Sequence, residues 1–154
     1  MITVVKTVVN KSSPGYEMFH KAGFLRWLGV ELITLSDGIC EARLPIRDEF
    51  LQQDGFVHAG IITTLADHCA GGAVGCKLNA DQKVLSIEFK TNFLRAAKSK
   101  ELFCRSTPLK VGRTIAVAES SIYSTLAEMH AEMQKGDVDA LIAKSTVTLA
   151  VLSV

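Results

Sequence analysis

Several motifs that mark common protein functions are missing from this sequence. The 17 basic and 16 acidic residues leave a formal charge of only +1, so the chain lacks the electrostatic footprint of a nucleic-acid-binding protein, and no nucleic acid is expected as a partner. No serine lies in a GxSxG motif, which disfavours serine-hydrolase chemistry. The glycine patterns of Walker and Rossmann nucleotide sites are absent as well.

The cysteines show neither a CxxC pair nor a histidine at the spacing of a zinc ligand. We therefore expect no metal site and interpret the thiols as small core residues, which suits a reducing, cytoplasmic setting. The four cysteines are Cys40, Cys69, Cys76 and Cys104.

An apolar run suited to a membrane is also missing. Lys6 interrupts the short apolar stretch at the N-terminus, which therefore does not resemble a secretory signal. Residues 56–78 are nearly uncharged, but His58, Asp67 and His68 would be expensive in lipid. We interpret this run as the core helix of a soluble protein, with no membrane span.

With 154 residues, of which 48% are hydrophobic, the chain is long enough to bury a core without disulfides or metals. No repeat or change of composition divides it, so we expect a single domain over residues 1–154. Residues 1–15 are expected to form a loose or edge-pairing arm that closes in a turn at Ser12 to Gly15.

Apolar spacing and turn signals predict the order of the remaining elements. Asp37-Gly38 is a strong signal for a hairpin turn between two strands. Thr125 and Glu128 have the spacing of a capping box, at the start of a helix that would stop at Gly136. The expected helices cover residues 16–27, about 58–78 and 125–135, and the expected strands cover residues 30–35, 39–46, 83–95, 100–109, 113–123 and 141–154.

This order predicts an α+β fold in which an antiparallel sheet wraps around the long helix at about residues 58–78. The helix is apolar on every side, as expected of an element that is buried all round. Its many small residues lower helix propensity but permit close approach of the sheet. The outer face of the sheet needs a cover wherever it is apolar, and a second subunit is the simplest one.

Asp67 is the first candidate functional residue, because a carboxylate within an apolar helix is costly unless it is hydrogen-bonded or used in chemistry. Taken alone, it fits a structural role as well as a functional one. A stripe of mostly small residues at helical spacing favours function, because it leaves room for a ligand. The stripe consists of Gly60, Thr63, Thr64, Ala70, Gly71 and Val74.

The start of the same helix is the second candidate. Free N–H groups around Ala59 and Gly60 carry the positive end of the helix dipole and can bind an oxyanion. Asp67 lies eight residues beyond Ala59, which is about 12 Å along a helix. One carbonyl cannot touch both groups, so the two must come from different subunits if they act together.

Other polar positions are less specific. His58 stands at the helix entrance, where a histidine more often fixes a loop or caps a helix than acts as a base. His68 points about 100° away from Asp67 and is assigned to packing or an interface. Lys90 and Arg95 belong to a group of basic residues near strand ends that could meet ligand phosphates, although ordinary solvation explains them better.

Residues 57–73, VHAGIITTLADHCAGGA, resemble the H-G-G-x-x-x-T-L-x-D segment of hotdog-fold acyl-CoA thioesterases, particularly the PaaI-like and human thioesterase superfamily member 2 type. Residues 86–96 look like that family's next strand, and the resemblance covers about residues 20–152. It implies a hotdog fold, hydrolysis of an acyl-CoA to free acid and coenzyme A, and a homodimer or a homotetramer built as a dimer of dimers. No metal or redox cofactor is implied, since coenzyme A enters only as part of the substrate.

The resemblance also implies residue roles. Asp67 corresponds to the carboxylate that activates water or itself attacks the thioester, and the N–H groups of Ala59 and Gly60 would stabilise the oxyanion. The family usually has glycine at the position of Ala59. Gln52 and Ser86 match positions that orient the thioester or the water. The residues assigned to substrate binding are His58, Thr63, Thr64, Gly71, Lys90 and Arg95.

Two other functions stay open at this point. The chain could be a non-catalytic acyl-CoA-binding hotdog module in which Asp67 is structural. A hotdog dehydratase ranks low, because it would need a histidine paired with an acid across the site and only His58 is near. The helix at residues 125–135 departs from the family pattern and could shape a coenzyme A or inter-subunit surface.

Overall fold

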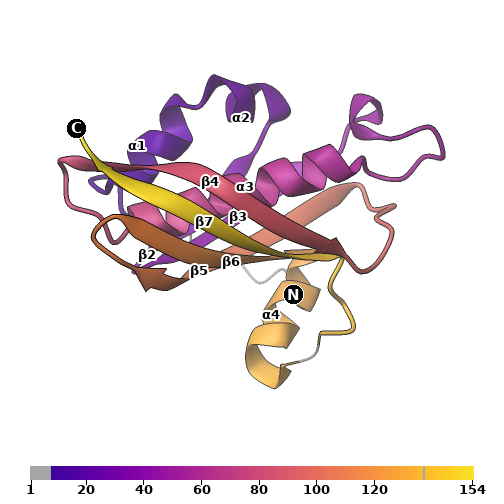
Figure 1. The fold of residues 1–154 in the computed structure, drawn as a ribbon. Helices are drawn as coiled ribbons and strands as arrows, with labels where there is room; N and C mark the ends of the chain where they lie inside the picture. The colour runs from indigo at the N-terminus through magenta and orange to yellow at the C-terminus, as the bar shows by residue number, and fades with distance from the viewer. Residues whose placement is uncertain (1–7, 137) are drawn as a thin grey trace.

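The computed structural model describes residues 8–136 and 138–154. The strands are β1 (Val8–Val9), β2 (Glu31–Ser36), β3 (Ile39–Pro45), β4 (Gln82–Phe93), β5 (Glu101–Val111), β6 (Ile115–Tyr123) and β7 (Ala143–Ser153), and the helices are α1 (Pro14–Lys21), α2 (Gly23–Leu28), α3 (Ala59–Gly75) and α4 (Leu126–Lys135), with a 3-10 turn at Asp48–Phe50. The strands form one sheet in the order β1-β2-β3-β5-β6-β7-β4. Helix α3 lies against one face of this sheet, with α1 and α2 on the same side (Figure 1).

The helix expected over residues 16–27 is in fact two helices. Ser13 caps α1, because its hydroxyl accepts a hydrogen bond from the Tyr16 N–H at 3.2 Å. The predicted turn is present but lies slightly earlier, where the Ser13 N–H donates to the Asn10 carbonyl at 3.3 Å, and Pro14 and Gly15 already belong to the helix. The extended backbone of Ala22 separates α1 from α2. Helix α2 ends at Gly29, as predicted, in the left-handed conformation with φ of 81°.

The sheet is antiparallel except at one edge. Val8 and Val9 pair in parallel with β2, which confirms an edge-pairing arm for these two residues, while the rest of the arm, residues 1–7, lies outside the described residues. Strands β2 and β3 form the predicted hairpin. Asp37 and Gly38 both have positive φ, 52° and 80°, as the favoured two-residue hairpin turn requires.

The two halves of α3 differ in burial. Every residue from Cys69 to Gly75 is buried, whereas Ala59 and Gly60 are exposed. The prediction of a helix buried all round is therefore wrong for the N-terminal half, because a groove between α3 and β4 stays open on that side.

The small residues of α3 allow α1 to approach it closely. A Cβ atom on Gly75 would lie 2.5 Å from the Gly15 Cα atom, and a Cβ atom on Gly15 would lie 2.6 Å from the Gly72 carbonyl oxygen. The small residues of α3 were predicted to let the sheet approach closely. The closest approach is instead made by α1, a segment far from the end of α3 in the sequence.

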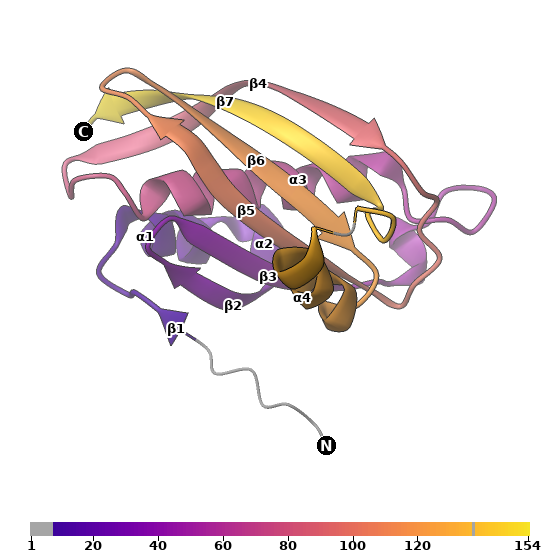
Figure 2. The same cartoon turned by 90° about the horizontal axis from the view of Figure 1, so that it is seen from below.

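Helix α4 covers the opposite face of the sheet (Figure 2). Met129 packs there against Phe103 and Tyr123. The predicted capping box of Thr125 and Glu128 is present. The chain's own inserted helix, and not a second subunit, therefore covers this part of the outer face.

The cysteines behave as predicted. Cys40, Cys69 and Cys104 are fully buried in the core and Cys76 is half-buried, all as free thiols. In the described part of the chain, no helix is long and apolar enough to cross a membrane.

Candidate functional site

An open groove runs between the N-terminal half of α3 and the edge strand β4. It holds two adjoining cavities of about 570 and 370 Å³, which are both lined by Ala59 and Phe93. The larger cavity also contains Gly60 and Asp67. The groove therefore connects the two half-sites that the sequence predicts, the start of the helix and the carboxylate.

Asp67 is held in place by the neighbouring strand. The Ser86 hydroxyl of β4 donates a hydrogen bond of 2.7 Å to Asp67 Oδ1. A bulge in β4 between Ser86 and Glu88 shifts the register against β7 next to this contact. Asp67 remains partly exposed, so its carboxylate is both oriented and open to the groove.

The start of α3 is capped by His58. Its Nδ1 atom accepts a hydrogen bond of 2.9 Å from the Gly60 N–H, and its carbonyl oxygen accepts from the N–H groups of Ile61 and Ile62. This confirms the structural role assigned to His58. Among the described residues, the Ala59 N–H has no hydrogen-bond partner, so it is the unused donor of the first turn, on a residue that lines both cavities.

The structure brings three more predicted residues to the groove. Thr63 and Thr64 line the larger cavity beside Asp67, and the Thr64 hydroxyl is used locally, donating 2.8 Å to the Gly60 carbonyl. Gln52 lines the smaller cavity. Its Oε1 atom accepts a hydrogen bond from the Asp54 N–H, which leaves the side-chain amide NH2 as its donor group.

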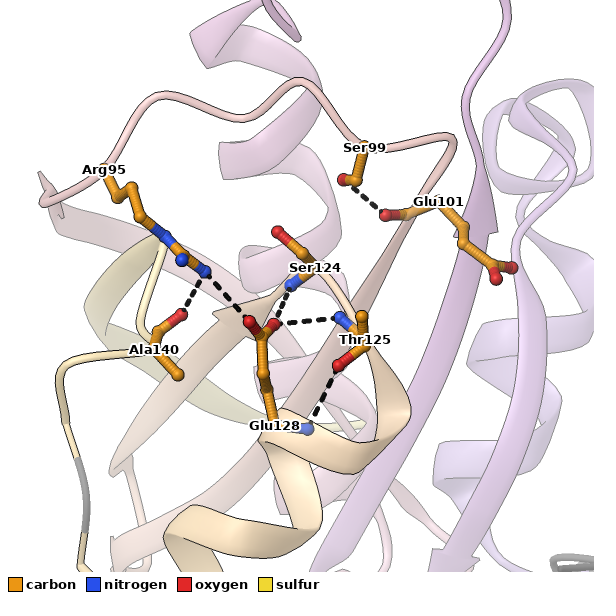
Figure 3. Close-up of polar contacts among 7 residues, drawn as sticks. All are labelled: Arg95, Ser99, Glu101, Ser124, Thr125, Glu128 and Ala140. Atoms are coloured by element: carbon orange, nitrogen blue, oxygen red, sulfur yellow. Dashed lines mark hydrogen bonds and ion pairs between the residues drawn. The ribbon is translucent and has the colours of Figure 1, made fainter.

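Other predicted residues lie elsewhere. Gly71 is buried, where a Cβ atom would contact Met18 and Leu149 at 3.6 and 3.9 Å, so the predicted stripe of small residues enters the core after Asp67. Lys90 is exposed on β4, outside the residues that line either cavity. Arg95 lines the smaller cavity, but its guanidinium points to α4 and the Ala140 carbonyl (Figure 3).

Aromatic residues that were not predicted also line the larger cavity. They are Phe24 of α2 with Phe89 and Phe93 of β4, and their side chains are 54%, 46% and 50% exposed. In sequence they look like ordinary core positions of an amphipathic helix and a strand. Only the open groove distinguishes these three residues from core residues. Their exposure depends on which strand lies at the edge of the sheet, which the sequence does not show.

His68 borders the same cavity. Its ring meets the ring of Phe19 edge to face at 4.7 Å, as expected of a packing residue. Burial lowers the pKa of His68 below its usual value, and the charge of Asp67 opposes this shift. Within the described residues, no group of three His, Cys, Asp or Glu side chains is arranged to hold a metal ion.

Comparisons with known proteins identify the family and the fold. Residues 54–129 match the family model of the thioesterase superfamily. A protein of Halobacterium salinarum, named provisionally as an esterase, is 32% identical over 115 residues, which are 71% of this chain and 76% of that protein. The 1,4-dihydroxy-2-naphthoyl-CoA hydrolase of Listeria monocytogenes is 22% identical over 100 residues, which are 65% of this chain and 81% of that enzyme.

A solved structure extends the likeness over nearly the whole chain. The crystal structure of a thioesterase family protein from Silicibacter pomeroyi superposes with a TM-score of 0.80 and 30% identity, covering 94% of this chain and 98% of that one. The predicted hotdog fold is thereby confirmed, and the chain belongs to the thioesterase superfamily.

Proposed function

We propose that this protein hydrolyses acyl-CoA thioesters to a free acid and coenzyme A. The observation that carries the proposal is the Asp67 carboxylate, which Ser86 orients and which lines an open groove beside the start of α3. The Listeria relative is named as a hydrolase of a CoA thioester, which supports coenzyme A as the carrier of the acyl group.

The helix start would stabilise the charge that develops on the thioester oxygen. The Ala59 N–H lies at the positive end of the α3 dipole, where an oxyanion is favoured. Gly60 was assigned the same task, but its N–H is bound to His58, so we propose Ala59 as the main donor. The methyl group of Ala59 narrows the groove without removing that donor.

Asp67 would act as general base or as nucleophile. As a base, it takes a proton from water while the water oxygen attacks the carbonyl carbon, and the C–S bond then breaks so that the coenzyme A thiolate leaves and is protonated. As a nucleophile, its oxygen attacks the carbonyl carbon and the C–S bond breaks, so that the coenzyme A thiolate leaves and is protonated; water then opens the resulting mixed anhydride to the free acid and the Asp67 carboxylate. Ser86 would orient the carboxylate or the water in either case, and Gln52 would contact the thioester from the smaller cavity.

A complete site would need two subunits. Asp67 and Ala59 are about 12 Å apart along one helix, which is too far for a single carbonyl. The edge strand β4 beside the groove exposes apolar side chains, with Leu85 at 59% and Ile87 at 55%, and such an edge favours pairing with another chain. We propose a homodimer, alone or within a tetramer, in which Asp67 of one subunit acts with the Ala59 N–H of the other.

The remaining assignments follow the same scheme. Thr63, Thr64 and His58 would border the acyl group together with the groove aromatics, and Gly71 would act only through the packing of α3. Phosphate binding by Lys90 and Arg95 stays a prediction. The four free thiols are consistent with work in a reducing compartment such as the cytoplasm.

Release of coenzyme A from a panel of short, aryl and long acyl-CoAs tests this function. The wild type is expected to release thiol from at least one class, and Asp67→Asn is expected to lower that rate by about 1,000-fold or more. Asp81→Asn, at an exposed turn, is the matched control and should keep the wild-type rate. Equal background release by wild type and Asp67→Asn, with retained binding of a non-hydrolysable acyl-CoA thioether, would instead establish an acyl-CoA-binding module.

A further inference from the structure

Segment 93–97, which begins at the last residue of β4, forms one wall of the groove at the start of α3. It lines the smaller cavity together with Ala59. Its backbone is tied at both ends: the N–H groups of Leu94 and Arg95 donate to the Ile142 carbonyl at 2.8 and 3.1 Å, and the Ala97 carbonyl accepts from the Val57 N–H at 2.9 Å. The width of the groove at Ala59 therefore depends on how this segment is held.

Between those ties, the Arg95 side chain reaches across to α4 and the loop before β7. Its Nη2 atom donates to the Ala140 carbonyl at 2.7 Å and approaches Glu128 Oε1 at 3.4 Å. Figure 3 shows the guanidinium placed between these two acceptors. A planar guanidinium held by two acceptors has a fixed direction, which an ammonium group would not have.

Glu128 serves two segments at once. Its Oε2 atom accepts hydrogen bonds of 3.1 Å from the N–H groups of Ser124 and Thr125, which completes the capping box of α4. Its Oε1 atom faces Arg95. The inserted helix is thereby connected, through one carboxylate, to the wall of the candidate site.

Stability alone does not account for this pair. The Arg95 and Glu128 side chains are 43% and 29% exposed, and ion pairs with such exposure contribute little to folding. Their effect is geometric, because they join two segments that are 33 residues apart in sequence.

We propose that α4 is a clasp for the substrate groove, in which Glu128 and the Ala140 carbonyl hold Arg95 and so set the position of segment 93–97 relative to Ala59. Arg95 and Glu128 are then positioning residues, and the activity part of this inference rests on the proposed acyl-CoA hydrolysis. The competing role of Arg95, as a ligand of coenzyme A phosphates, would require its charge to be available to the substrate.

Kinetics with two substrates separate these roles. Acyl-CoA and the matching acyl-pantetheine share the thioester, but the pantetheine compound lacks the phosphates. For a clasp, Glu128→Gln and Arg95→Met each raise KM about fivefold for both substrates with little change in kcat, and the double variant is no worse than either single one. Unchanged KM values would overturn the proposal. It is also overturned if Arg95→Met impairs acyl-CoA alone while Glu128→Gln improves it, which would identify a phosphate ligand.

Hydrogen exchange gives a readout that needs no catalysis. In both clasp variants we expect several-fold faster exchange of the amides of Leu94, Arg95 and Val57, because these amides donate the hydrogen bonds that hold segment 93–97. Glu17→Gln, which breaks the exposed pair with Lys21 on α1, is the matched control and should leave these amides unchanged. Wild-type exchange in Glu128→Gln and Arg95→Met would refute the clasp. Faster exchange in a protein that hydrolyses no thioester would refute the proposed function and leave the clasp standing.

Discussion

The Ser86 hydroxyl donates a hydrogen bond of 2.7 Å to the Asp67 carboxylate, and so joins the edge strand β4 to the middle of α3. The contact restricts the orientation of the carboxylate at the place where the groove is open. A bulge in β4 next to Ser86 changes the register of the strand at this point. The hydroxyl thus fits a role in the site better than a role in the core.

Ser86→Ala tests this relationship. Loss of a hydrogen bond to an ionised carboxylate, together with the loss of an orienting group, is expected to lower kcat by about tenfold. The fold should persist, because the removed hydroxyl is not buried. Ser36→Ala is the matched control, since Ser36 also donates to a neighbouring aspartate, at 3.3 Å in a distant hairpin, and should not affect thiol release. A Ser86→Ala enzyme with wild-type kcat would argue that Asp67 needs no partner.

His58 is predicted to stabilise the start of α3 through its acceptor atom and not through its charge. His58→Ala removes the cap of Gly60 and should lower the free energy of unfolding by about 1 kcal/mol. His58→Asn offers an oxygen to the same N–H and should stay within a few tenths of a kcal/mol of the wild type. Urea unfolding measures both. Equal losses in the two variants would show that the ring packs and does not cap.

Two glycines of α3 should respond in opposite ways to alanine. At Gly75 a Cβ atom would lie 2.5 Å from Gly15 Cα, and forcing α1 away from α3 should cost about 2 kcal/mol or more. At Gly71 the Cβ atom meets Met18 and Leu149 at ordinary distances of 3.6 and 3.9 Å, so the higher helix propensity of alanine should stabilise by up to about 1 kcal/mol. Thermal unfolding of the two variants gives the comparison. Similar shifts in both would contradict the close contact of α1 with α3.

We predict that protonation of His68 lowers the free energy of unfolding in mild acid. Burial lowers its pKa below the usual 6.5, so the unfolded chain binds the proton more readily than the folded one. Its contribution to stability is therefore full above pH 6.5 and is lost as the pH falls from that value towards the folded-state pKa. His68→Phe, which can keep the edge contact with Phe19, should flatten this part of the curve of unfolding free energy against pH. Parallel curves for wild type and variant would contradict the assignment.

Local signals in the sequence predicted much of the fold. The hairpin at Asp37-Gly38, the capping box of Thr125 and Glu128 and the helix end at Gly29 each depend on a few adjacent residues, and all are present. The break between α1 and α2 was missed, because it lies at the extended backbone of Ala22, a residue type that favours helix and gives no signal of a break. The backbone contact of Gly15 with Gly75 could not be predicted, since nothing local marks which glycines will meet.

The sequence also predicted several residues of the candidate site. The residues of one helix pointed to the Asp67 carboxylate and the helix start, and the resemblance to hotdog thioesterases added Ser86 of the next strand. The capping role of His58 was predicted from its place at the helix entrance, but which N–H it occupies depends on a ring rotamer. The link from Glu128 to Arg95 depends on tertiary packing and leaves no signature in sequence spacing.

The central claim is that Asp67 of one subunit acts with the Ala59 N–H of the other. Ala59→Pro removes that N–H and keeps the helix start, because proline is tolerated at the first position of a helix and His58 already has the extended backbone, with ψ of 136°, that a following proline requires. Asp67→Asn removes the carboxylate. Each variant alone should be inactive.

The decisive measurement is thiol release by the two variants unfolded and refolded together, with heterodimers verified by native mass spectrometry. A heterodimer contains one intact site, made of Asp67 from the proline variant and the Ala59 N–H from the asparagine variant. Random pairing therefore predicts recovery of about one quarter of wild-type activity. A mixture that contains heterodimers and is as inactive as its components would contradict the two-subunit site.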